Sequence, residues 1–167
     1  TKIENYLNNN GKMMVMLSSV LDINSSQLKN ILSILEEYNI GIRDDIIFEN
    51  SESNALAGYP TYFRPDFEWE EVTMGVSKSK LRVLIPESRS LKILDKEIPG
   101  LTVTSIAKTS SDSWGEINLN ERARRDEKDT SGPMDVIIKA EKTLSGENPT
   151  TSKIIVYGNY INIADNV

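Results

Sequence analysis

The sequence predicts a three-layer α/β fold, in which a mostly parallel sheet is flanked by helices on both faces. Two short, continuously apolar segments support this prediction: Lys12–Leu17 near the start of the chain and Lys153–Tyr157 near its end. Such runs are typical of strands buried on both faces, as in parallel sheets. A strand, a helix and a second strand also follow one another within residues 12–48, which predicts a right-handed βαβ unit.

Two helices are predicted in the first third of the chain. Ile3, Tyr6 and Leu7 share one helical face, so a short helix is expected within residues 1–10. The clearest helix is expected over residues 26–38, where apolar residues recur at helical spacing behind a capping serine. The second strand of the βαβ unit is then expected at Asp45–Phe48.

The middle of the chain predicts an irregular excursion. Residues 49–70 are too broken by glycine and proline for a regular element, and too aromatic for a disordered linker. Its aromatic residues are Tyr59, Tyr62, Phe63, Phe67 and Trp69. Further strands are expected at 81–85, 101–107, 134–140 and 153–157. A long polar loop is expected at 109–132. The pattern of residues 88–94 does not decide between a strand and a helical turn.

Composition limits the function. At 167 residues the chain is expected to form one domain, and its net charge of −6 argues against nucleic acid or an anionic membrane surface as a partner. The basic cluster Arg122–Arg125 runs into the acidic segment Asp126–Asp129, so the local charges are expected to cancel.

Histidine and cysteine are both absent from the sequence. The chain therefore has no thiol nucleophile, no imidazole base and no Cys/His zinc site. We expect no catalytic residue, no metal and no cofactor, and we expect the protein not to be an enzyme. No segment approaches the length of a membrane span.

The carboxyl ends of the two apolar strands are where an α/β sheet would bind a ligand. Ser18, Ser19 and Asp22 follow the first strand, and Asn159 follows the last. These side chains could bind a small polar ligand or a peptide, or they could simply cap the turns. Trp114 and Glu116 lie in the long loop, where the tryptophan is either a recognition residue or an anchor for that loop.

Four segments resemble the GldG-type auxiliary domain of ABC transport systems. They are Asn10–Leu17, Thr109–Glu116, Asp129–Pro133 and Lys153–Asn159, in the order and spacing of that family. Two departures occur, because Ser18-Ser19 stands where the family often has Asp-Pro, and Asn159-Tyr160 where Asp-Ser is common.

The resemblance implies a Rossmann-like extracytoplasmic domain, held by membrane helices beside an ABC permease and its ATPase. Some members of the family that these segments resemble serve gliding motility, and related domains occur in intraflagellar-transport proteins. On this basis, residues 1–167 are expected to be a single, partial domain from a longer membrane-anchored protein on the extracytoplasmic face of the cell membrane.

The expected function is non-catalytic recognition within that transport system, with the permease and ATPase subunits as partners. Trp114, Glu116 and the aromatic excursion would supply the contact surface. Two alternatives stay open at this point. One is a carboxylate-dependent hydrolase with part of its catalytic groups outside this chain, and the other is a purely structural protein-interaction scaffold.

Overall fold

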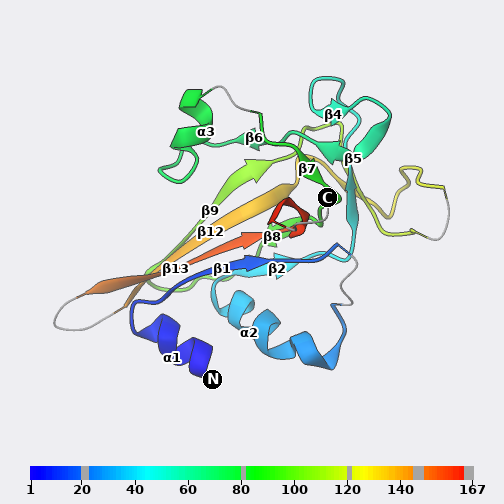
Figure 1. The fold of residues 1–167 in the computed structure, drawn as a ribbon. Coiled ribbons are helices and arrows are strands. Elements are labelled where there is room, and N and C mark those ends of the chain that lie inside the picture. Colours follow the sequence, from blue (N-terminus) through cyan, green and yellow to red (C-terminus); the bar gives the residue numbers. More distant parts are fainter. Residues whose placement is uncertain (20–22, 80–81, 120–121, 145–148, 164–167) are drawn as a thin grey trace.

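The computed structural model describes residues 1–19, 23–79, 82–119, 122–144 and 149–163. A seven-stranded sheet forms its centre. The strands of this sheet are β1 (Lys12–Met16), β2 (Ile40–Ile42), β6 (Asp66–Phe67), β8 (Leu91–Ile93), β9 (Leu101–Lys108), β12 (Asp135–Leu144) and β13 (Thr150–Tyr157). Their order is β1-β13-β12-β8-β2, with β9 also beside β12 and β6 beside β9 (Figure 1).

The predicted fold class is wrong. The chain is 37% strand and 17% helix, so it is mostly β rather than a Rossmann-like α/β fold. β1 and β13 pair in parallel, whereas the other pairings among the described strands are antiparallel. The βαβ unit does not form either, because β3 (Ile46–Phe48), which lies where its second strand was predicted, pairs antiparallel with another strand in a separate small sheet.

Two small antiparallel sheets complete the fold. One contains β3 (Ile46–Phe48), β10 (Trp114–Glu116) and β11 (Thr130–Ser131), and the other contains β4 (Ala55–Leu56), β5 (Tyr59–Phe63) and β7 (Ile85–Pro86). The aromatic segment is folded, as expected, but it is not irregular, because it contains β4, β5 and β6. The segment 109–132 is likewise not all loop. The predicted strand over 81–85 is wrong, since the described part forms a strand only from Ile85.

Helices α1 (Lys2–Asn8) and α2 (Lys29–Glu37) lie on the same side of the large sheet (Figure 1). They confirm the helices predicted near residues 1–10 and 26–38, the second one entered through a short 3₁₀ turn (Ser26–Leu28). Leu7, Ile34 and Leu35 are buried against the sheet. The sheet residues of this core are Ile138, Ala140, Ile154 and Val156.

The opposite face of the large sheet is only partly covered. Along β12 and β13 burial alternates from residue to residue, as expected for strands with one fully covered face. A third helix, α3 (Met74–Ser79), lies towards one end of this second face, beyond β9. We call this second face, formed by the alternate residues of β1, β13 and β12, the open face.

The open face explains why the fold prediction failed. Ile155 and Met14 alternate with core residues along their strands, yet they are apolar too. This made each strand apolar without interruption, which is also the pattern of a strand covered on both sides. Here the second set of apolar side chains is left half-buried or exposed instead.

Candidate functional site

The predicted ligand site at the strand ends is occupied by protein atoms. Because β1 and β13 are parallel, Ser18 and Asn159 do lie at the same edge of the sheet. Arg89 is buried there, with only 3% of its surface exposed. Its Nε–H group donates to the Ser18 carbonyl at 2.8 Å. Its backbone N–H donates to the Gly158 carbonyl at 2.9 Å. A buried arginine therefore joins the two strand ends.

Asn159 is fully buried and acts within the turn that contains it. Its amide nitrogen donates to the carbonyls of Pro86 and Glu87. Its Oδ1 accepts from the Asn162 backbone N–H at 3.2 Å, at the start of a 3₁₀ helix (Ile161–Ile163). This geometry corresponds to the capping alternative rather than to ligand binding. Ser19 is also buried, and Asp22 lies outside the described residues.

Trp114 and Glu116 are held in the β3-β10-β11 sheet. The Trp114 ring stacks on Phe48 with ring centroids 5.2 Å apart, which is the geometry of an anchor. Glu116 is buried, and its two carboxylate oxygens accept from the backbone N–H groups of Asn118 and Arg124. Glu116 therefore offers no free contact surface, whereas Trp114 is half-buried in its role as an anchor.

The aromatic segment is divided between the core and the surface. Phe63 is fully buried and belongs to a second core cluster, which joins the small sheets to the large one. Tyr59 and Trp69 are exposed. The predicted contact residues therefore do not form one surface.

The open face instead carries an apolar groove of about 240 Å³. Its floor is formed by side chains of β1, β13, β12 and β9, and its wall by α3 and the residues that flank it. The lining residues are Met14, Met16, Phe67, Val72, Thr73, Val76, Val83, Ile106, Ile137, Ile155 and Tyr157. Met14 is 63% exposed and Val72 is 52% exposed, so the groove is open to solvent.

A row of charged residues borders the groove on the same face. Lys139 lies directly beside Ile155 across the β12–β13 pair, and its Nζ contacts Glu70 at 2.7 Å and Glu141 at 3.1 Å. Lys153 in turn contacts Glu141 at 2.6 Å. Because these four charges pair with one another, the border contributes little net charge to the groove.

The pKa shifts of this face follow from these contacts. Hydrogen bonding to Glu70 raises the pKa of Lys139, and hydrogen bonding to Lys153 lowers the pKa of Glu141. Burial raises the pKa of Tyr157 to about 12, so its phenol stays neutral near pH 7. These shifts all hold the groups in their ordinary charge states, which suits packing better than proton transfer.

In the described part of the chain, no three acidic residues are grouped so that they could hold a metal ion. Among the same residues, none of the helices is both long and apolar enough to cross a membrane. The groove, an apolar hollow with a neutral border, can bind an apolar surface.

Comparison of the chain with protein-family models, with curated proteins and with solved structures finds no match.

The groove and the role of Arg89 were not predicted from the sequence. The signal for the groove was present, because Met14 and Ile155 are apolar at positions where a solvent-facing strand residue is usually polar. Arg89 lies in the segment 88–94, which gave no periodic pattern. Its role depends on three segments far apart in the sequence, and no local signal could have indicated it.

Proposed function

We propose that this chain is a non-catalytic recognition domain that binds a partner protein through the groove on its open face. The observation that carries the proposal is the apolar character of that face, above all the exposure of Met14 and Val72. Contiguous exposed apolar surface on a folded domain usually marks an interaction site. Methionine side chains, here Met14 and Met16, adapt readily to a partner's shape.

The occupant proposed for the groove is an amphipathic segment of a partner protein. The opposite face of the same sheet is covered by α1 and α2, whose apolar residues pack on alternate strand residues. A further apolar segment beside α3 would cover the open face in the same way. The border charges of Lys139, Glu141 and Lys153 pair with one another, so the segment needs an uncharged apolar stripe over the groove.

The partner proposed is the permease of an ABC transport system, through segments on its extracytoplasmic side. Support comes from the four sequence segments that resemble GldG-type auxiliary domains. The mostly antiparallel sheet departs from the fold that this resemblance implies, so the assignment depends on those segments and on the groove. The extracytoplasmic location and the membrane anchoring of the parent protein are part of the same proposal.

The hydrolase alternative has less support. Glu116 is the predicted carboxylate that lies within the described residues, and both of its oxygens accept hydrogen bonds from the backbone. A general acid or base must reach its substrate, and this carboxylate is buried.

Binding to the permease tests the proposal directly. A permease and an ATPase found encoded beside the gene would be reconstituted in nanodiscs, and the fluorescently labelled domain would be titrated with them. Met14→Asp places a charge in the groove and is expected to weaken binding at least tenfold. Ile3→Asp is the matched control, because Ile3 is 42% exposed on α1, behind the other face of the sheet.

The control variant should bind as the unmodified domain does. Absence of binding to the nanodiscs, or equal binding by Met14→Asp and the unmodified domain, would contradict the proposal.

A further inference from the structure

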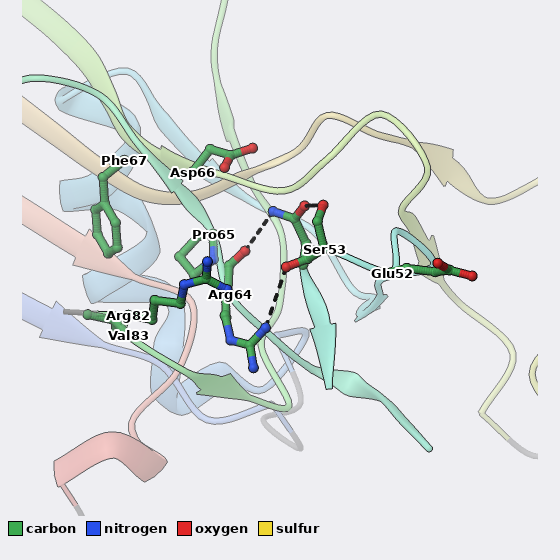
Figure 2. A pocket seen from close by; sticks show the side chains of 9 residues that line it. Glu52, Ser53, Arg64, Pro65, Asp66, Phe67, Arg82 and Val83 are labelled. Carbon is green, nitrogen blue, oxygen red and sulfur yellow. Dashed lines mark hydrogen bonds between the residues drawn. The ribbon is translucent and has the colours of Figure 1, made fainter. Parts of the chain in front are cut away.

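A second pocket, which we call the arginine pocket, lies next to the groove. It has a volume of about 420 Å³ and is lined by two arginines, Arg64 and Arg82, together with the acidic residues Glu52 and Asp66 (Figure 2). Figure 2 shows both arginine side chains reaching into the same space, while the Glu52 carboxylate points away from them. Within the described part of the chain, neither guanidinium group forms a salt bridge.

The backbone around Arg64 is fixed by the turn opposite it. The Arg64 N–H donates to the Asn54 carbonyl at 2.8 Å, and the Asn54 amide nitrogen donates to the Arg64 carbonyl at 2.9 Å. The guanidinium group makes one long contact, from Nη1 to the Ser53 carbonyl at 3.5 Å. Most of its donors are therefore available to a ligand.

The pocket brings two guanidinium groups together. Their like charges repel each other, and an anion between them would relieve this repulsion. The planar guanidinium group binds carboxylate through two parallel hydrogen bonds, which gives such a site its geometric preference.

The arginine pocket and the groove are adjacent. Phe67 and Val83 line both, so one apolar wall separates the guanidinium groups from the floor formed by Met14 and Ile155. A segment that lies in the groove can therefore place a neighbouring side chain in the arginine pocket.

We infer that Arg64 and Arg82 bind a carboxylate of the docked segment. The partner then presents apolar side chains to the groove and an aspartate or glutamate to the arginine pocket. This inference rests on the proposed function, because it names the chemistry of the segment that the groove binds. It also makes the site selective, since the apolar floor alone would accept many apolar segments.

Selection from a phage-displayed library of random peptides tests the inference, because such a selection does not require an identified partner. The unmodified domain is expected to enrich sequences that combine an apolar stripe with an acidic residue at a fixed spacing. The double variant Arg64→Gln/Arg82→Gln should enrich the apolar stripe without the acidic residue. Arg125→Gln, a single charge change in the loop after β10, is the control and should select as the unmodified domain does.

An enriched peptide would then be synthesised with its acidic residue or with the corresponding amide. On the unmodified domain, the amide peptide is expected to bind about tenfold more weakly. On the double arginine variant the two peptides should differ by less than about twofold. Equal losses on both proteins, or enrichment of apolar sequences with no acidic residue, would overturn the inference and leave the groove as a binding site.

The proposed function has a separate readout in the same experiment. If binding of the enriched peptide is unaffected by Met14→Asp, or if no sequence is enriched at all, then the groove is not the binding site. That outcome overturns the proposed function, and this inference with it. Circular dichroism and thermal melting of each variant confirm that the compared proteins are folded.

Discussion

Replacement of Arg89 with methionine is expected to destabilise the domain by about 3–6 kcal/mol. The guanidinium group donates to the Ser18 carbonyl at 2.8 Å and to the Arg43 carbonyl at 3.1 Å. Hydrogen bonds that involve a charged group contribute about 1.5–3 kcal/mol each, and both carbonyls lose such a donor in the variant. Methionine fills much of the space of the arginine stem, so the contribution of a cavity is small.

The ion pair of Arg89 with Asp44 should contribute much less. The two groups are 2.9 Å apart, but the Asp44 side chain is 61% exposed. A carboxylate that keeps its hydration gains only about 0–1 kcal/mol from such a pair. Asp44→Asn should therefore cost at most about 1 kcal/mol, and Arg89→Lys, which keeps the charge but has fewer donors, should fall between the two variants.

Urea denaturation followed by tryptophan fluorescence measures these differences. A lower midpoint with an unchanged slope would report a change in stability alone. The reasoning is refuted if Arg89→Met loses less than about 1 kcal/mol, or if Asp44→Asn loses as much as Arg89→Met. Either result would mean that the stability of the domain does not depend on the bonds from the guanidinium group to the Ser18 and Arg43 carbonyls.

Two further predictions concern buried and paired carboxylates. Glu49 is 1% exposed, and its carboxylate accepts from the N–H groups of Ser51 and Ser110 and from the Ser110 hydroxyl. Glu49→Gln should therefore lower the free energy of unfolding, measured by urea denaturation, by about 2–4 kcal/mol. A loss no larger than that of Ser110→Ala, which is expected to be about 1 kcal/mol, would contradict this. Lys153 lowers the pKa of Glu141 below its ordinary value of 4.5. The stability that Glu141 contributes to the fold is therefore fully present above pH 4.5 and is lost as the pH falls through the lowered pKa. Glu141→Gln should therefore be about 1 kcal/mol less stable than the unmodified domain at pH 7 and equally stable in strong acid, and a difference that persists at low pH would count against the pairing.

Local features of the fold were predictable from the sequence. Helix α2 has a clear apolar stripe, and β9, β12 and β13 fall where the sequence analysis expected strands. Strand direction was not predictable, because an apolar run such as Ile154–Tyr157 has the same composition in either kind of sheet. The pairings are also set by contacts between distant segments, which no local pattern contains.

The candidate site was predicted less well than the fold elements. Ser18 and Asn159 were correctly expected at one edge of the sheet, since β1 and β13 are parallel neighbours. Whether such polar side chains face a ligand or the protein depends on what fills the space beside them, and here Arg89 fills it. The groove residues were recognised only as strand residues, because exposure is a property of the assembled layers.

The pairing of β1 with β13 has a consequence for biosynthesis. Lys12 lies opposite Lys153, so the two strands are 153 − 12 = 141 residues apart in the chain. At ribosomal rates of about 5–20 residues per second, the first strand waits roughly 7–28 seconds for its neighbour to be synthesised. During that interval its methionines are exposed on the nascent polypeptide, which makes the emerging chain a natural client for chaperones that bind extended apolar segments.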